Sequence, residues 1–422
     1  MAQPRLTDEL PTGTPREAGG IIRRTFSSLR HRNFRLYFIG QMVSNTGNWL
    51  TNVALTLLVL KITGSGLRVG VLAACQYGPL VLFSPYAGSL ADRFSKRRSL
   101  IVTQTLEMAQ SVGLAVLAFL PRPSTIALYG LALAGGTFLA FDNPLRRSFV
   151  TEMVAPEDLP NAIVLYSTIV NGSRIFGPAL AGLLIVSVGY GWCFAIDAVS
   201  YIAVLACLFL MRESELHRSG QTAERKGAVR AGLRYVFDTP PLWISFMMLA
   251  ILGTLSYNFN VTLPLFVTRV LRGEERTYTL LYSTFSVGAV ACSLLIAHRG
   301  LTRMRDIILG AVLLGISISM LAPVSSVALA IPVILFIGGA GILYMTATTA
   351  IAQVEAKPEM HGRVLALQTV LIGGPLAVGG PILGWVADRF GGRAPMVLGG
   401  IAAFVAAAIG AWANRRYNTP IT

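Results

Sequence analysis

The sequence predicts an all-α membrane protein in which twelve transmembrane helices form two pseudo-symmetric six-helix bundles. Three observations support this fold class. Of the 422 residues, 54% are hydrophobic and only 13% are charged, with a mean hydropathy of +0.62, whereas about a quarter of the residues of a soluble domain are charged. Long apolar stretches follow one another along nearly the whole chain. The connections between them alternate between many and few Lys and Arg residues, as in multi-pass membrane proteins.

Twelve apolar stretches have lengths near the roughly 20 residues that a helix needs to cross a bilayer. They cover residues 36–60, 69–90, 100–120, 125–143, 162–188, 192–211, 242–268, 279–297, 307–322, 327–353, 364–386 and 394–412. The longest polar break separates six stretches from six. We therefore expect an amino-terminal tail with a surface helix (1–35), a six-helix bundle (36–211), a cytoplasmic linker (212–241), a second six-helix bundle (242–412) and a carboxy-terminal tail (413–422).

Two basic segments outside the bundles are predicted to lie along the membrane surface as helices. One covers residues 21–33 in the tail and the other covers residues 224–238 in the linker. The Lys and Arg side chains of such helices are attracted to anionic lipid head groups.

The distribution of Lys and Arg predicts the orientation. Of the 35 Lys and Arg residues, 26 lie in the two tails, in the linker or in connections on the same side of the membrane as these. Eight lie in connections on the opposite side, and Arg174 lies within a span. Cytoplasmic connections carry the excess of Lys and Arg, so we expect a multi-pass protein of the bacterial cytoplasmic membrane with both termini in the cytoplasm. This clustering also explains the net charge of +15 without nucleic-acid binding.

The residue types that catalysis and metal binding need are scarce. The four cysteines, Cys75, Cys193, Cys207 and Cys292, lie within apolar stretches without metal-ligand spacing, which is typical of free thiols used as small apolar residues. The sequence contains no nucleotide-binding motif and no pairing of a nucleophile with a base. We therefore expect no metal, no cofactor and no enzymatic activity, and a monomer in the lipid bilayer.

Three sequence matches relate the two halves of the chain. Ala91-Asp-Arg and Ala297-His-Arg are 206 residues apart, Pro156-Glu and Pro358-Glu are 202 apart, and Gly177-Pro and Gly380-Pro are 203 apart. Nearly constant spacing indicates a duplicated six-span unit. Transporters with parallel repeats of this kind bind their substrate between the halves, near the middle of the membrane.

The connection after the second stretch contains the strongest motif, G-S-L-A-D-R-F-S-K-R-R-S-L at residues 88–100. It resembles the loop signature of the major facilitator superfamily over all thirteen positions. The resemblance implies a gate formed by Gly88, Asp92, Arg93 and Arg97. The alternative is that the basic residues only anchor the loop on the cytoplasmic side. Asp388-Arg389 repeats part of the motif on the opposite side, where we expect a structural turn.

Residues 141–162, 171–182 and 191–194 extend the resemblance to one branch of that superfamily, which includes enterobactin-type siderophore exporters and macrolide efflux proteins. Gly177-Pro178 also resembles the antiporter motif of drug:proton exchangers. The resemblance implies the major facilitator fold and export of a small organic solute by alternating access, in exchange for protons. An uptake or lipid-moving carrier on the same fold, or a membrane receptor or scaffold that does not transport, remain alternatives.

Polar residues within the first stretch fall on one helical face. These are Gln41, Asn45, Asn48 and Asn52, spaced by four, three and four residues. Amides are costly against lipid, so we expect this face to line a substrate cavity or to join neighbouring helices. Asn258 in the seventh stretch is the counterpart in the other half.

Arg174 is predicted to lie deep in the fifth span, one helical turn from Asn171. Counted from Ala162 it lies about 18 Å along the helix, and a cation at mid-membrane costs at least ~2.5 kcal/mol. We expect it either to bind an anionic group of the substrate or to pair with Glu107 or Asp197. Asp142 is expected beside Arg146 at the cytoplasmic end of span four, in a network with the loop arginines.

Overall fold

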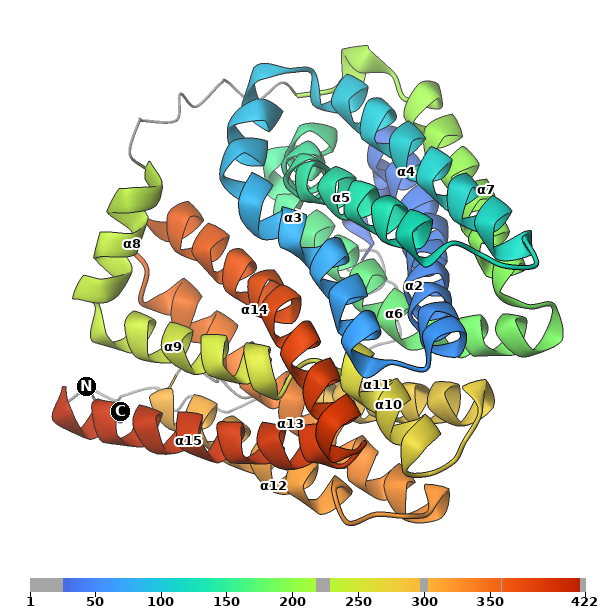
Figure 1. The fold of residues 1–422 in the computed structure, drawn as a ribbon. Helices are drawn as coiled ribbons and strands as arrows, with labels where there is room; N and C mark the ends of the chain where they lie inside the picture. The colour runs from blue at the N-terminus through green and yellow to red at the C-terminus, as the bar shows by residue number, and fades with distance from the viewer. Residues whose placement is uncertain (1–25, 218–227, 297–302, 358, 418–422) are drawn as a thin grey trace, which may run out of the picture.

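A computed structural model describes residues 26–217, 228–296, 303–357 and 359–417 (Figure 1). The side chains of residues 84–85, 87–93, 171, 175 and 228–229 lie outside this description. The described residues form helices and loops and contain no β-strand.

The helices of the first half of the chain are α2 (Arg32–Thr63), α3 (Gly66–Arg93), α4 (Lys96–Phe119), α5 (Thr125–Met153), α6 (Leu159–Ser187) and α7 (Tyr190–Leu210). Those of the second half are α8 (Ala228–Asp238), α9 (Pro240–Leu255), α10 (Phe259–Arg269), α11 (Glu275–Ile296), α12 (Met304–Leu321), α13 (Val327–Val354), α14 (His361–Phe390) and α15 (Ala394–Arg416). Short 3-10 turns, η1 (Ser27–Arg30), η2 (Pro156–Asp158) and η3 (Glu213–Glu215), precede α2, α6 and the linker.

Eleven segments of the described chain are long and apolar enough to cross a membrane, with α9 and α10 counted as one segment. The first predicted span, α2, is not among them because amides interrupt its apolar sequence. Its 32 residues still give a helix of about 48 Å, which packs against α6 and α7. Each of the twelve predicted spans corresponds to a helix or, for the seventh, to a helix pair, so the predicted fold class is confirmed.

Several predicted boundaries differ from the structure. Helix α5 continues to Met153, ten residues beyond the predicted end, because Phe149, Val150 and Met153 keep an apolar buried face after Pro144. The seventh span is interrupted between α9 and α10. Of the predicted amino-terminal surface helix (21–33), residues 21–25 lie outside the described chain, Ser27–Arg30 form η1 and the last two residues begin α2, whereas the linker helix is present as α8.

The helices form two groups, α2–α7 and α9–α15. The groups meet mainly where α3 packs on α14 and α6 on α11, with smaller contacts of α10 with α2 and α3 (Figure 1). We call the surface between the groups the seam. These contacts support our proposed division of the chain into two six-span halves.

Glycines allow α3 and α14 to approach with their backbones in contact. A Cβ atom at Gly70 would overlap the carbonyl group of Gly380, and one at Gly384 would overlap that of Gly66. Because residue numbers rise along α3 as they fall along α14, the two helices are antiparallel. Small residues at helix contacts are a common way to bring membrane helices together.

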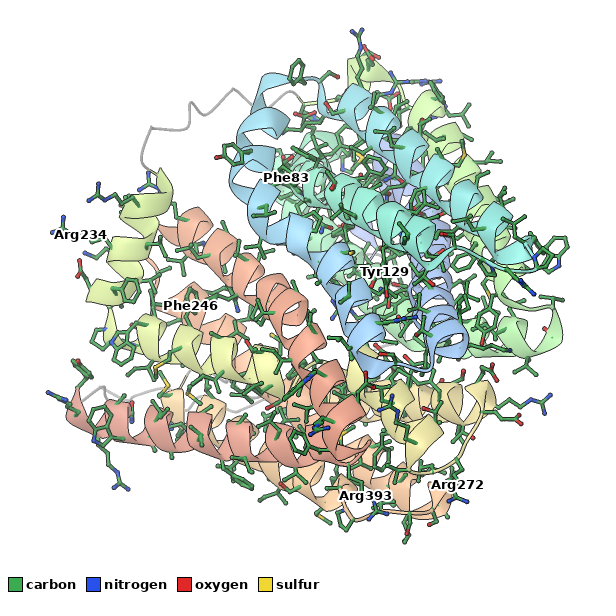
Figure 2. All side chains as sticks on the ribbon, viewed as in Figure 1. Phe83, Tyr129, Arg234, Phe246, Arg272 and Arg393 are labelled. Atoms are coloured by element: carbon green, nitrogen blue, oxygen red, sulfur yellow. The ribbon has the colours of Figure 1, made fainter. Side chains whose placement is uncertain are left out.

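We name the two ends of the molecule by their features. The linker end carries α8 with Arg234, and the Asp388 end carries Arg272 and Arg393 on its loops (Figure 2). Helices α3 and α14 lie together toward the Asp388 end and diverge toward the linker end (Figure 1).

Candidate functional site

A chain of hydrogen bonds crosses the seam between the halves. The Tyr77 hydroxyl of α3 accepts hydrogen bonds from Asn52 Nδ2 of α2 at 3.4 Å and from Asn260 Nδ2 of α10 at 3.3 Å. Tyr282 of α11 donates to Asn260 Oδ1 at 3.2 Å. We call Asn52, Tyr77, Asn260 and Tyr282 the seam cluster. It combines amide and phenol groups from four helices and both halves.

Arg174 lies on α6 next to this cluster. Its side chain is exposed, and its guanidinium is within electrostatic range of Tyr257 and Tyr282. Within the described part of the chain, no carboxylate forms an ion pair with it. The structure thus places a cation beside a polar and aromatic surface where the two halves meet.

Pro178 explains how α6 is joined to α11 at this point. Proline has no N–H group, so the carbonyl four residues earlier loses its helical hydrogen bond. That carbonyl belongs to Arg174, and the Ser286 hydroxyl of α11 donates to it at 3.2 Å. Gly182 allows the close approach of α11, since a Cβ atom there would overlap Thr279, whereas Gly177 allows α6 to pack closely on Trp49 of α2.

A second polar group lies inside the first half. Arg146 of α5 is 3% exposed and donates to Asp142, to Gln41 and, at 3.4 Å, to Glu107. Gln104 Nε2 donates to Glu107 at 3.0 Å and to Asp142 at 2.9 Å. We call Gln41, Gln104, Glu107, Asp142 and Arg146 the buried charge network.

Among the described side chains, Asp142 therefore contacts Arg146 and not Arg97 of the loop. Its hydrogen bonds go to Arg146 and Gln104, and it accepts one from Thr103 at 2.8 Å. Arg97 instead binds the carboxyl end of α7, donating to the Leu208 carbonyl at 2.7 Å and to Glu213 at 2.6 Å. The difference arises because α5 is longer than predicted, which leaves Asp142 inside the bundle.

Asp197 of α7 is fully buried and binds hydroxyl groups from three helices. It accepts hydrogen bonds from Thr51 at 2.6 Å, Ser111 at 2.7 Å and Ser200 at 3.4 Å. Neither Asp197 nor Glu107 is paired with Arg174. The sequence had left such an ion pair open as one of two roles for Arg174.

The amides of α2 have different neighbours although they share one face. Gln41 belongs to the buried charge network, and Asn45 donates to its Oε1 atom at 3.1 Å. Asn48 accepts a hydrogen bond from Tyr201 of α7 at 2.7 Å. Only Asn52 reaches the seam. Gln41 and Asn48 therefore join α2 to α5 and α7, while the hydrogen bonds of Asn45 stay within α2.

Asn258 occupies the interruption between α9 and α10. Its side chain is buried, and its amide nitrogen donates to the carbonyl groups of Gly253 and Thr254, both at 2.9 Å. These carbonyls lie at the end of α9, where helical partners are missing. Asn258 thus stabilises the interruption.

Four predicted residues have side chains outside the described part of the structure. Gly88, Asp92 and Arg93 lie in the last turns of α3, and Asn171 lies in α6. For these residues only the position along the helix is known.

Sequence reasoning placed Arg146 beside Asp142 but missed its contacts with Glu107 and Gln41, and it missed Tyr77 and Tyr282. The spacing of Asp142 and Arg146 by four residues was a signal for the buried network, since such residues are neighbours on a helix. Tyr77 and Tyr282 gave no comparable signal.

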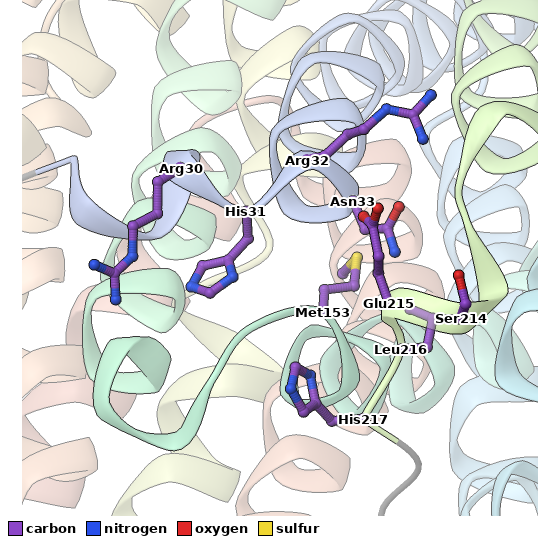
Figure 3. A pocket seen from close by; sticks show the side chains of 9 residues that line it. All are labelled: Arg30, His31, Arg32, Asn33, Met153, Ser214, Glu215, Leu216 and His217. Carbon is purple, nitrogen blue, oxygen red and sulfur yellow. The ribbon is translucent and has the colours of Figure 1, made fainter.

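Two pockets open at the ends of the molecule. One, of about 490 Å³, lies at the linker end and is lined by Arg30, His31, Arg32, Asn33, Met153, Ser214, Glu215, Leu216 and His217 (Figure 3). There Arg30 and His31 both bind Asp158 at 2.7 Å, which fastens η1 to η2.

The second pocket, of about 350 Å³, lies at the Asp388 end between α2, α10 and α11. It is lined in part by Lys61, Arg269 and Glu275. Among the described side chains, no group of three or more His, Cys, Asp or Glu residues is arranged to hold a metal ion.

The sequence profile of the transmembrane secretion effector family, within the major facilitator superfamily, matches residues 23–417. The chain belongs to this family. It is 24% identical to the staphyloferrin A transporter of Staphylococcus aureus over 62% of the chain and 66% of that protein. It is 27% identical to the enterobactin exporter EntS of Salmonella typhimurium over 43% of the chain and 44% of that protein. The first match therefore covers just under two thirds of that relative's length, and the second covers less than half.

Solved structures support the same fold. A bacterial homologue of the human lysosomal transporter Spinster superimposes with a TM-score of 0.72 at 16% identity, covering 92% of this chain and 98% of that one. A POT family transporter superimposes with a TM-score of 0.76 at 11% identity, covering 92% and 97%. The family member described here is therefore a multi-pass membrane protein with the major facilitator fold.

Proposed function

We propose that this family member is a secondary transporter that exports a small anionic solute of the siderophore class by alternating access, in exchange for protons and as a monomer. The observation that carries the proposal is the position of Arg174. An exposed guanidinium whose charge acts on Tyr257 and on Tyr282 of the seam cluster can hold a carboxylate or phenolate group through paired hydrogen bonds. The names of the relatives, a staphyloferrin A transporter and an enterobactin exporter, support a siderophore as the solute.

The buried charge network supports the proposed coupling to protons. Two carboxylates, Glu107 and Asp142, face the single guanidinium of Arg146. With both carboxylates ionised, this group holds one uncompensated negative charge, which is unfavourable away from water. Binding of one proton removes that charge. Glu107 and Asp142 are therefore the residues we propose for coupling, with Asp197 as a neighbouring site.

We also propose that the linker end faces the cytoplasm. This orientation rests on the excess of Lys and Arg in the tails and in the connections on their side of the membrane. It places the motif of Gly88, Asp92, Arg93 and Arg97 at the cytoplasmic face, where its gate role remains a proposal. Pro178 would act at the seam, by shaping the contact between α6 and α11, and Gly177 would act within the first half, by letting α6 pack closely on Trp49 of α2.

Everted membrane vesicles test the proposal. With the cytoplasmic face outward, an exporter should accumulate radiolabelled staphyloferrin A or enterobactin when a proton gradient is present, and a protonophore should abolish accumulation. Arg174→Gln should lose most of the uptake and of the binding affinity for the same probe. Arg174→Lys should retain part of both, because the charge remains while the paired hydrogen bonds are lost. Arg122→Gln, an exposed loop arginine, is the control.

The melting temperature of the purified variants separates binding from folding. Arg174→Gln should melt like the wild type, since the residue has no described ion pair to lose. A large fall in melting temperature that Glu107→Gln restores would make Arg174 structural and contradict the proposal. Accumulation in right-side-out vesicles would indicate an uptake carrier, and absence of transport with both probes would contradict the siderophore assignment.

A further inference from the structure

Asp388, near the carboxyl end of α14, binds the amino terminus of α3 across the seam. Its carboxylate accepts hydrogen bonds from the Ser65 hydroxyl at 2.8 Å and from the backbone N–H groups of Gly66 at 2.7 Å and Leu67 at 2.9 Å. The first N–H groups of a helix lack helical partners, and the helix dipole favours an anion at that position. A helix of one half is thus capped by a side chain of the other half.

Arg269 of α10 strengthens this contact. Its guanidinium donates to Asp388 at 2.5 Å and to the Gly64 carbonyl at 3.0 Å, and a third hydrogen bond goes to the Ala387 carbonyl at 2.8 Å. The side chains of Arg269 and Asp388 are 26% and 28% exposed, so solvent only partly screens the pair. Arg269 therefore holds Asp388 and the loop before α3 together.

A second contact closes the same end. Glu275, at the start of α11, accepts a hydrogen bond from the Tyr190 hydroxyl at 2.7 Å and pairs with Lys61 at 3.3 Å. Tyr190 and Lys61 both belong to the first half. Because Lys61 is 63% exposed, this pair is weaker than that of Arg269 with Asp388.

We propose that Asp388 and Arg269 form a latch that holds the Asp388 end of the seam closed, and that this end opens only when the carboxylate leaves the amino terminus of α3. The proposal deepens the proposed function, because it names the contact that sets which face of the transporter is open. Asp388 is thus a gating residue. The sequence predicted a structural turn at Asp388-Arg389, but both residues lie in the last turn of α14, which binds the other half.

The sequence supports the latch independently of its hydrogen bonds. Residues 384–390 read G-W-V-A-D-R-F, and residues 88–94 read G-S-L-A-D-R-F. The two segments lie at the carboxyl ends of α14 and α3, which are antiparallel. Each helix therefore carries the motif near the end where its partner helix begins. The latch is the counterpart, at the Asp388 end, of the motif at the linker end.

Distances between spin labels test the latch in purified protein in lipid nanodiscs. In a background without the four native cysteines, labels at Ile126 and Arg276 report on the Asp388 end, and labels at Thr151 and Val354 report on the linker end. In Asp388→Asn the ratio of open to closed molecules at the Asp388 end should rise about tenfold, which corresponds to about 1.4 kcal/mol. The distance at the linker end should shorten in the same fraction of molecules.

Two further variants and a control make the result decisive. Arg269→Gln should produce the same shift. Ser65→Ala should produce a smaller shift, and it still tests the latch if Asp388→Asn does not fold. Asp238→Asn changes an exposed carboxylate of α8, 3.8 Å from Arg234, and should change neither distance. Unchanged distances in all three seam variants would overturn the latch. Since no substrate or gradient is present, this outcome is independent of whether the protein exports a siderophore.

Discussion

Arg146 and Arg174 have opposite environments. Arg146 is buried and hydrogen-bonded to Asp142, Glu107 and Gln41, whereas Arg174 is exposed at the seam. Burying a charge is tolerated when ionised and polar partners surround it. Arg146 therefore holds α2, α4 and α5 together, while Arg174, which forms no ion pair among the described side chains, is the residue that we propose to bind the ligand.

Substitution of Arg146 should destabilise the protein. In Arg146→Gln the carboxylates of Glu107 and Asp142 stay buried without a counter-charge, and breaking such a group typically costs roughly 3–5 kcal/mol. We expect a clear fall in the melting temperature of the detergent-purified protein, partly recovered by adding Glu107→Gln and Asp142→Asn. Arg147→Gln, at the next and exposed position, is the control. Equal melting temperatures for the variants at 146 and 147 would contradict the structural importance of the network.

At this scale the sequence was informative about residue types but not about their partners. Arg174 could be found because it stands alone in an apolar stretch. The pairing of Glu107 with Arg146 could not, because it depends on how α4 and α5 are rotated against each other. The seam cluster was equally hidden, since tyrosines such as Tyr77 are as common in apolar packing as in binding sites.

At the scale of the elements, the position and order of the helices followed from hydropathy, but several ends did not. The polar residues Asp142 and Arg146 ended the apolar stretch of the fourth span, although their mutual contacts allow the helix to continue. The interruption of the seventh span depends on Asn258, whose amide satisfies carbonyls that an unbroken helix would satisfy itself. Such compensation involves three-dimensional neighbours that hydropathy does not describe.

The glycine contact of α3 with α14 provides a test at this scale. In Gly70→Ala the added methyl group would overlap the backbone of Gly380, and overpacking of this kind costs about 1–3 kcal/mol. We expect a lower melting temperature and reduced transport. Gly78→Ala, on the same helix with nothing within 4 Å of the added atom, should behave like the wild type or be slightly more stable. If both variants behave alike, the close contact is unimportant for folding and transport.

At the scale of the whole molecule, the fold and the charge distribution agree on one arrangement. The two groups of helices meet along α3–α14 and α6–α11, and the described hydrogen bonds of Ser65 with Asp388 and of Tyr190 with Glu275 cross the seam at the Asp388 end. In the orientation that we propose, the face that opens is the cytoplasmic one. This is the state in which an exporter receives its substrate.

Cysteine labelling in whole cells checks the orientation. In the cysteine-free background, single cysteines at Arg122 and Ser325, in exposed loops of the Asp388 end, should react with a membrane-impermeant maleimide. A cysteine at Ser214, exposed at the linker end, should react only after the cells are lysed. Labelling at position 214 in intact cells would reverse the topology.

Where α3 and α14 touch, their surfaces are nearly smooth, because Gly66, Gly70, Gly380 and Gly384 present backbone instead of side chains. Interdigitated side chains must separate before one helix can turn against another, whereas smooth surfaces can roll while staying in contact. The two halves can therefore rotate about this line of glycines with little loss of packing. A few polar contacts at the two ends of α3 and α14 then decide which end of the molecule is open. A single charge change far from the substrate should therefore be enough to reverse the side to which the protein opens.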